Sequence, residues 1–557
     1  MIFFTRPGTD LEGAIDSVDD LIELGLNKFK ARVLFKHITE WKTIGLPQDF
    51  TPPATSASST SVLTPVTTTS PSPYQDKQLD QDFTSARYSS DQAATQRLHA
   101  AAVEGNHLAE SYLSVLYGRG GSLVKKDSDE ALSYVQKALP WLREHAYTPH
   151  CNPYAQFALA ICYSNGCGVA QDYSTSIALM RMAADKGIAG ALNSLGNTYY
   201  QGEGVNVDYA EAVKYYKLAA DQGHSGAQSN LGTCYDNGQG VSVDHVEAVK
   251  YYKLAAEQGY ANTQCGLGYC YSNGHGVPVD HAEAAKYYKL AADQGRAVAQ
   301  FNSGVCFANG RGVPVDYTAA TKYYKLAADQ GYADAQLNLG VCYNNGQGVA
   351  VNYGEAVKYF KLAAQQGHAT AQYNLGKCYA NGRGVSVDHA EAAKYYKLAA
   401  DQGHAEAQHN LGYCYESGQG VPVDHAAAVK YYKLAADQGR AVAQFNSGVC
   451  FANGQGVPMD HIEAVKYFQL AADQGDAYAQ NNLGYCYENG KGVPVNYGEA
   501  VKYYKLAADQ GIARAQCNLG HCYEKGHGMP EDHAEAIKYY KLAADQGDVD
   551  AKEKLKR

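Results

Sequence analysis

A repeat of 36 residues runs through most of this sequence and limits the folds that the chain can adopt. One lysine returns at the same place in ten consecutive units, mostly within the phrase KYYKLAADQG, as Lys214, Lys250, Lys286, Lys322, Lys358, Lys394, Lys430, Lys466, Lys502 and Lys538. With 557 residues, the chain is too long for one ordinary globular core. A regular period of about 20–50 residues is typical of arrays in which each unit packs on its neighbours. We therefore predict a repeat array.

Each unit predicts two helices joined by a turn. In residues 224–259, the first helix is HSGAQSNLGTCYDNG, the turn is GQGVSV and the second helix is DHVEAVKYYKLAAEQG. Asp244 and Glu247 have the spacing of a capping box at the start of the second helix. The same spacing is found at Asp280/Glu283, Asn352/Glu355, Asp388/Glu391, Asp460/Glu463, Asn496/Glu499 and Asp532/Glu535.

Glycines mark the helix ends and one position inside the first helix. Gly223 after the second helix, and Gly238 and Gly240 in the turn, suit the left-handed backbone conformation that ends a helix. Gly232 lies inside the first helix, where glycine costs about 1 kcal/mol relative to alanine. Because this glycine returns in ten units, we expect a neighbouring helix to approach it closely.

The cysteines form a second row. Ten of the fourteen stand at one equivalent place per unit: Cys162, Cys234, Cys270, Cys306, Cys342, Cys378, Cys414, Cys450, Cys486 and Cys522. Equivalent atoms of stacked helical units lie roughly 10 Å apart, whereas a disulfide needs Cα atoms closer than about 7 Å. We therefore expect buried, reduced thiols in a cytoplasmic protein.

The repeat closely resembles the Sel1-like repeat family, a relative of the tetratricopeptide repeat. The shared pattern is A-x-x-x-x-[LS]-G-x-C-[YF]-x-x-G-x-G-V-x-x-D followed by E-A-x-K-Y-Y-K-L-A-A-x-Q-G, strong over residues 154–547 and weaker over 98–153. The resemblance implies a superhelix whose first helices line a concave groove that holds partner proteins or peptides. Most units carry one cysteine, unlike the paired cysteines of the secreted relatives. The signal and membrane segments of the endoplasmic-reticulum relatives are also not seen.

We therefore predict an all-α fold, a right-handed superhelical α/α solenoid of about twelve 36-residue helix-turn-helix repeats. It would span residues 98–557, with a degenerate first repeat and a partial C-terminal cap at 548–557. Residues 1–47 have apolar side chains at roughly helical spacing and predict a small helical N-terminal segment. Residues 48–90 are rich in Ser, Thr and Pro and predict a disordered linker.

A partner-binding face is predicted from variation among the units. In the first helix of unit 224–259, positions 226, 229, 233 and 236 lie on one side, opposite the core stripe, and they change in nearly every unit. Several units place apolar or aromatic residues there, which is typical of a contact surface. The alternative is neutral drift combined with packing between adjacent first helices. The candidates are Val298, Phe301, Val305, Leu337, Val341, Tyr373, Lys377, His409, Tyr413, Val442, Phe445, Val449, Asn481 and Tyr485.

Two of these units are copies of each other. The stretch RAVAQFNSGVCFANG occupies residues 296–310 and again 440–454, and NYGEA also returns after 144 residues, so a block of four repeats was duplicated. The hypothesis is that two like apolar pockets, around Phe301 and Phe445, receive two anchors of one extended partner or two copies of one motif.

A row of asparagines flanks this face and includes Asn338, Asn374 and Asn410. An amide can donate to and accept from a peptide backbone, so the row could hold a ligand. The alternative is that each asparagine bonds to an adjacent helix or turn.

The remaining features argue against other classes of function. The net charge is −10 without a basic block, which disfavours nucleic acid as a partner, and no apolar run is long enough to span a membrane. Histidines that begin second helices are 36 residues apart, so they cannot converge on a metal ion. No motif places a catalytic set, and the G-x-G turns lack the rest of a phosphate loop. We expect no cofactor.

The predicted function is a non-catalytic scaffold or adaptor that binds a protein or peptide in the concave groove. Two alternatives stay open. Activity could reside in residues 1–97, with the repeats as a targeting module, or the chain could be a host-directed effector or surface-binding protein of an intracellular microbe.

Overall fold

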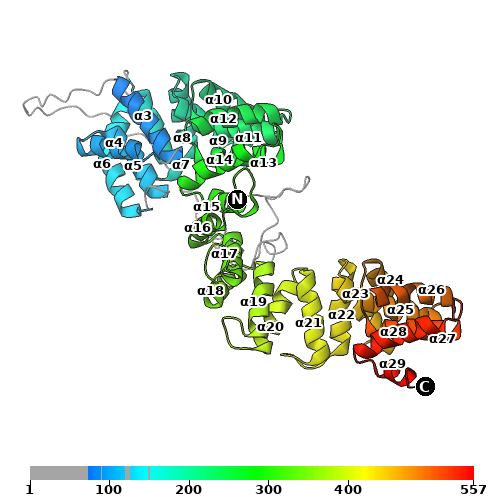
Figure 1. The fold of residues 1–557 in the computed structure, drawn as a ribbon. Helices are drawn as coiled ribbons and strands as arrows, with labels where there is room; N and C mark the ends of the chain where they lie inside the picture. Colours follow the sequence, from blue (N-terminus) through cyan, green and yellow to red (C-terminus); the bar gives the residue numbers. More distant parts are fainter. Residues whose placement is uncertain (1–72, 89–90, 120–125, 148–150, 557) are drawn as a thin grey trace, which may run out of the picture. The chain divides into compact units, whose positions relative to one another are not determined.

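The structure, a computed structural model, describes residues 73–88, 91–119, 126–147 and 151–556 (Figure 1). These residues form 27 helices, α3 to α29, and no strand. The helical segment predicted at residues 1–47 and the part of the predicted linker before residue 73 lie outside the described residues.

The helices alternate between the first and second helices of successive units. The first helices are α5 (His107–Arg119), α7 (Pro153–Asn165), α9 (Ala189–Gln201), α11 (Ser225–Asn237), α13 (Ala261–Asn273), α15 (Ala297–Asn309), α17 (Ala333–Asn345), α19 (Ala369–Asn381), α21 (Ala405–Ser417), α23 (Ala441–Asn453), α25 (Ala477–Asn489) and α27 (Ala513–Lys525). The second helices are α6 (Ser128–Tyr147), α8 (Tyr173–Asp185), α10 (Tyr209–Asp221), α12 (His245–Glu257), α14 (His281–Asp293), α16 (Tyr317–Asp329), α18 (Tyr353–Gln365), α20 (His389–Ala400), α22 (His425–Asp437), α24 (His461–Asp473), α26 (Tyr497–Asp509) and α28 (His533–Asp545). Two helices, α3 (Pro73–Tyr88) and α4 (Gln92–Val103), precede them, and α29 (Val549–Lys554) follows.

Packing follows chain order. Each first helix packs on the second helix of its own unit, and that second helix packs on the first helix of the next unit. The all-α repeat solenoid is therefore confirmed. The short α29 starts a further first helix and stops, as the charged C-terminal fragment predicts.

The predicted capping boxes form only in part. The Asp244 side chain accepts a hydrogen bond from the backbone N–H of Glu247 at 2.9 Å. The Glu247 carboxylate does not reach back but pairs with Lys250 at 2.5 Å. The reason is that the Asp244 N–H already donates to the carbonyl of Tyr235 in the first helix, at 2.9 Å. The other six predicted boxes have the same bonding.

The glycine inside the first helix has the expected close neighbour. A Cβ atom on Gly232 would lie 2.6 Å from Cε1 of Tyr252 in the second helix of the same unit. A turn glycine makes an equally close approach between units, because a Cβ on Gly276 would lie 2.0 Å from the carbonyl oxygen of His245. These two contacts fix the spacing of helices within a unit and between units.

A row of buried glutamines also joins the units. The Gln372 side-chain amide donates to the carbonyl of Ala364 in the preceding second helix at 3.2 Å. The Gln372 side-chain carbonyl accepts from the Gln402 amide at 2.7 Å. The same arrangement recurs at Gln264, Gln300, Gln336, Gln408, Gln444, Gln480 and Gln516.

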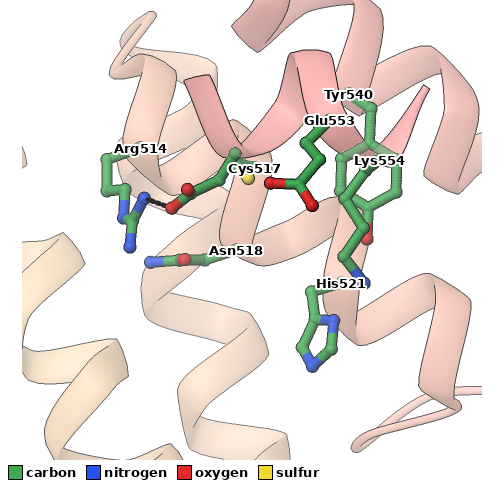
Figure 2. Close-up of a pocket in the computed structure, with 8 residues that line it drawn as sticks. Arg514, Cys517, Asn518, His521, Tyr540, Glu553 and Lys554 are labelled. Atoms are coloured by element: carbon green, nitrogen blue, oxygen red, sulfur yellow. Dashed lines mark hydrogen bonds and ion pairs between the residues drawn. The ribbon is translucent and has the colours of Figure 1, made fainter. Parts of the chain in front are cut away.

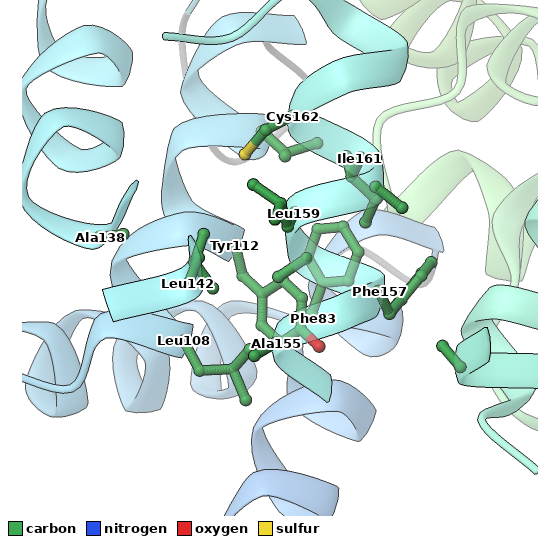
Figure 3. Close-up of a cluster of buried hydrophobic side chains, with 14 of the residues drawn as sticks. Phe83, Leu108, Tyr112, Ala138, Leu142, Ala155, Phe157, Leu159, Ile161 and Cys162 are labelled. Atoms are coloured by element: carbon green, nitrogen blue, oxygen red, sulfur yellow. The ribbon is translucent and has the colours of Figure 1, made fainter. Parts of the chain in front are cut away.

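Residues 73–88 differ from the expectation of a disordered linker over 48–90. They form α3, whose Leu79 and Phe83 are one turn apart and buried. The Phe83 ring stacks on Tyr112 of α5 with centroids 4.4 Å apart (Figure 3). The Ser/Thr/Pro-rich composition ends just before Pro73, and a short helix with two apolar side chains gains its stability from packing rather than from its own composition. The packed array thus begins at Pro73, before the predicted boundary at residue 98.

The ten cysteines of the repeat row are free thiols and buried. Burial raises the pKa of Cys234 to about 12 and that of Cys450 to about 11. Since the thiolate is the reactive form, these cysteines are held in an unreactive state.

A thiol reagent such as DTNB should therefore modify the native protein slowly at the buried row. Cys151, Cys167 and Cys265 are half-buried and should react first. Mass spectrometry of partly modified protein would locate the modified thiols, and urea-unfolded protein gives the full rate as the control. Rapid native modification of Cys234 or Cys450 would contradict this packing.

None of the described helices has the length and apolar character that a membrane crossing requires.

Candidate functional site

The candidate site is the variable face, which we define as the positions of the first helices equivalent to 226, 229, 233 and 236. None of the predicted partner-binding residues is fully buried. Val298, Tyr413, Val442 and Tyr485 are 40–48% exposed, and Lys377 is exposed as well. The others are half-buried: Phe301, Val305, Leu337, Val341, Tyr373, His409, Phe445, Val449, Asn481, Asn338, Asn374 and Asn410.

The two duplicated phenylalanines fill seams between units. The Phe301 ring lies 5.9 Å from Tyr324 and 5.3 Å from Tyr332, measured between centroids. Phe445 repeats this arrangement, 6.1 Å from Phe468 and 6.0 Å from Tyr478. Because these rings pack on their own and the following unit, the exposed apolar side chains that these two units contribute to the variable face are Val298 and Val442.

Other aromatic residues of the face have their own neighbours. The Tyr373 ring stacks on His404 at 4.7 Å, and the Lys377 ammonium lies 5.5 Å from the Tyr373 centroid. The exposed Tyr485 ring has the Lys491 ammonium 5.0 Å from its centroid. Such cation–π contacts on an exposed face leave the ring edges open to a partner.

The two most exposed aromatic residues of the variable face are not among the predicted partner-binding residues. Tyr269 is 56% exposed and Tyr478 is 61% exposed, whereas the predicted residues Tyr413 and Tyr485 are 48% and 44% exposed. Both occupy variable positions, so the signal was present. Their exposure could not be read from the sequence, because equivalent positions differ in burial from unit to unit.

The asparagine row bonds within the array. Asn338 forms a hydrogen bond with the Tyr324 hydroxyl, and Asn410 forms one with Tyr396. The Asn446 amide lies 3.1 Å from Nε2 of His409 in the preceding first helix. These contacts favour the structural interpretation of the row.

Contacts also join the starts of adjacent first helices. Arg440 pairs with Glu406 at 2.6 Å, and His368 lies 3.1 Å from Asp334. The Asn518 amide donates to Asn481 at 3.1 Å. Neighbouring first helices therefore touch, and their exposed side chains belong to one surface.

A cavity of about 270 Å³ lies where the array ends, between α27, α28 and α29 (Figure 2). Its charged groups largely neutralise one another, because Arg514 pairs with Asp550 and Lys554 pairs with Glu524 at 2.6 Å. The Lys554 ammonium holds the pKa of Glu524 down to about 2. These ion pairs hold α29 against α27.

Comparison with protein families gives twelve matches to one family model, described as Sel1 repeat. The matched residues are 107–139, 153–188, 189–224, 225–260, 261–295, 297–332, 333–368, 369–404, 405–439, 441–476, 477–512 and 513–548.

Two of the solved structures that are similar to the chain are Sel1-repeat proteins. One is c5321, described as a protective antigen present in uropathogenic Escherichia coli strains and displaying an SLR fold. It is 32% identical, with a TM-score of 0.65, and the match covers 81% of this chain and 95% of that one. The other is a Sel1 repeat protein from Oxalobacter formigenes, 34% identical over 55% of this chain and 89% of that one, with a TM-score of 0.46. No curated protein sequence matches the chain.

Proposed function

The chain belongs to the Sel1 repeat family, and from this premise we infer that it is a non-catalytic scaffold that binds a segment of a partner protein along its first helices. Repeats of this kind generally serve as scaffolds for protein interaction. The proposal places the bound segment on the variable face, which corresponds to the concave groove of the repeats that this family resembles.

One observation carries the proposal. Three consecutive first helices, α21, α23 and α25, present Tyr413, Val442, Tyr478 and Tyr485 with 44–61% exposure. Exposed apolar side chains gathered on one surface are typical of a contact site. Tyrosine in particular is enriched among the residues that contribute most to binding.

The chemistry of this surface favours one kind of occupant. The carboxylates of Glu416 and Glu488 lie on the same helices, each accepting a hydrogen bond at 2.7 Å from a tyrosine hydroxyl of the second helix. With the net charge of −10, they favour a segment that carries Lys or Arg beside its apolar anchors. We expect an extended peptide with aromatic or aliphatic side chains and basic residues between them.

The expected result of Tyr485→Asp or Tyr413→Asp is at least a tenfold loss of affinity, about 1.4 kcal/mol, for such a peptide. Peptides would be selected on the wild-type protein from a displayed library, and binding measured by fluorescence polarisation. Leu434→Asp is the matched control, because Leu434 is an equally apolar residue, 40% exposed, on the second helix α22. It should leave the affinity within twofold.

The outcome that refutes the proposal is the reverse pattern, with Leu434→Asp weakening binding and the two tyrosine variants unchanged. Circular dichroism would establish that each variant keeps its helices. Phe301→Asp and Phe445→Asp are unsuitable here, because each would place a carboxylate in a packed seam.

Deleting residues 1–72 separates this function from an activity of the N-terminal region. This deletion keeps α3 and its packing on the array. A deletion up to residue 97 would remove α3 and with it the stacking of Phe83 on Tyr112. Retained peptide binding would assign the function to the repeats.

A further inference from the structure

Only two of the G-x-G turns carry a histidine between their glycines, His275 and His527. In both cases the preceding unit carries a carboxylate at the last position of the variable face, Asp236 and Glu488 respectively. The carboxylate position and the turn position lie in contact in this fold. At the equivalent positions one unit earlier than Asp236 and His275, the Tyr200 hydroxyl donates a hydrogen bond to the Gln239 side chain at 2.6 Å.

The first cluster consists of Asp236, His245 and His275. Asp236 lies in the last turn of α11, His245 begins α12, and His275 follows α13 in the next unit. Asp236 Oδ1 is 2.8 Å from His245 Nδ1, and the two imidazole rings are 4.3 Å apart. One donor atom from each residue lies within 4.8 Å of the other two.

The backbone brings His275 to this place. Gly276 sits directly on the carbonyl of His245, at a distance where a Cβ atom would lie only 2.0 Å from the oxygen. The proximity of the two histidines therefore depends on the packing of one unit on the next rather than on a chosen rotamer.

The second cluster consists of Glu488, His521 and His527, again with donor atoms within 4.8 Å of one another. Here Tyr497 occupies the place of His245 and stacks on His527 at 4.4 Å. The third ligand comes instead from His521 of α27, whose ring is 6.0 Å from that of His527. Nδ1 of His527 is shielded from solvent and makes no hydrogen bond with any residue that the structure describes.

The two clusters thus occupy one structural place with different third ligands. In the first, Tyr269 takes the position that His521 has in the second, with its ring 6.3 Å from His275. Histidines at equivalent positions of different units are too far apart to share one metal ion, as predicted from their spacing of 36 residues. These clusters combine different positions from two adjacent units.

Two imidazoles and one carboxylate are a ligand set for a divalent transition metal such as zinc. Calcium and magnesium prefer oxygen ligands alone. A tetrahedral zinc ion with bonds of about 2.0–2.1 Å holds its ligand atoms about 3.3 Å apart. Side-chain rotations that move the donor atoms by about 1 Å would bring all three onto one ion.

We propose that Asp236, His245 and His275 bind one zinc ion, and that Glu488, His521 and His527 bind a second. Each ion joins a unit to the next, with solvent completing its coordination. Zinc therefore stabilises two unit boundaries, one in each half of the repeat array.

The test is zinc titration of the full chain by calorimetry, with His275→Gln and His527→Gln as variants. Glutamine occupies the same turn position at Gln239, Gln347, Gln419 and Gln455, so the variants keep a side chain that this fold already accepts. Wild-type protein should bind two more zinc ions than the double variant, and each single variant should lose one. Loss of a ligand should weaken its site at least tenfold.

Two further measurements test the coordination of the metal and its effect on stability. Cobalt should produce the visible absorption of a tetrahedral site in the wild type and not in the double variant. Zinc should raise the melting temperature of the wild type by more than that of the double variant, because an ion that binds only the folded state stabilises it.

A substitution that should create a third zinc site provides a further test. Glu416 and His425 occupy the places of Asp236 and His245, with Gln455 at the place of His275. Gln455→His should create a third site and add one zinc ion. Equal zinc binding by the wild type and the double variant, or no saturable binding by the wild type, would overturn the proposal.

Discussion

Gly268→Ala is expected to destabilise the array by about 2 kcal/mol or more, whereas Gly266→Ala, two residues away in the same helix, should stabilise it by up to about 1 kcal/mol. A Cβ atom on Gly268 would lie 2.7 Å from Cδ1 of the Tyr288 ring, which is 5% exposed. A Cβ on Gly266 meets no atom within 4 Å. Both substitutions replace a glycine of α13 by alanine, and they differ in what the new methyl group contacts.

Urea unfolding and hydrogen exchange in α13 and α14 would measure the difference. A solenoid can open unit by unit, so the midpoint of urea unfolding averages over several units. Hydrogen exchange is needed because it assigns the change in stability to individual helices. Stabilisation by both substitutions would mean that the close approach of Tyr288 does not hold. Destabilisation by both would mean that α13 requires glycine for a reason other than this contact.

The second large effect is expected at His224 when the pH is lowered. His224 is 8% exposed, and its Nδ1 accepts a hydrogen bond from the backbone N–H of Ala227 at 3.1 Å. Burial, with a smaller contribution from Arg87 of α3, lowers its pKa from 6.5 to about 4. Between these values the unfolded chain binds a proton that the folded chain does not, so stability falls as the pH falls through this window.

The full loss corresponds to about 3 kcal/mol once the pH is below about 4. His224→Asn keeps an acceptor for the helix end and removes the titration, so the variant should lose less stability than the wild type between neutral pH and pH 4. Other titrating groups contribute equally to the stability of both proteins, so their contributions cancel in the comparison. One such group is Asp80, whose pKa is raised to about 6 by burial.

His404→Asn is the matched control for this experiment. His404 begins α21 in the same way, but it is less buried and Glu406 opposes the lowering of its pKa by burial. Its removal should change the pH dependence of unfolding less than removal of His224. An equal change in both variants would contradict the role of burial at His224.

Most of the secondary structure was predictable from the sequence, because the signals that define it are local. The 36-residue period, the Asp or Asn that begins each second helix and the glycines that end each helix all act within a few residues. The capping boxes show where local signals stop. Glu247 has the right spacing, but the Asp244 N–H is already bonded to Tyr235 in the first helix, and no local pattern reveals that bond.

The candidate site was predictable only as a set of positions. Variation among units pointed to Phe301 and Tyr413 alike, and packing separates them. Phe301 is half-buried against two tyrosines, while Tyr413 is 48% exposed. The difference depends on the residues of the next unit, which an alignment of equivalent positions leaves out.

By itself the sequence determined that this chain is an all-helical array of Sel1 repeats, because periodicity, caps and turn glycines are properties of short stretches that recur. Only the tertiary structure decided which variable side chains stay accessible, that Pro73–Tyr88 joins the array, and that His275 meets His245 and Asp236. The physical reason is that these contacts join unlike positions of neighbouring elements, and their distances are set by how closely one helix packs on the next.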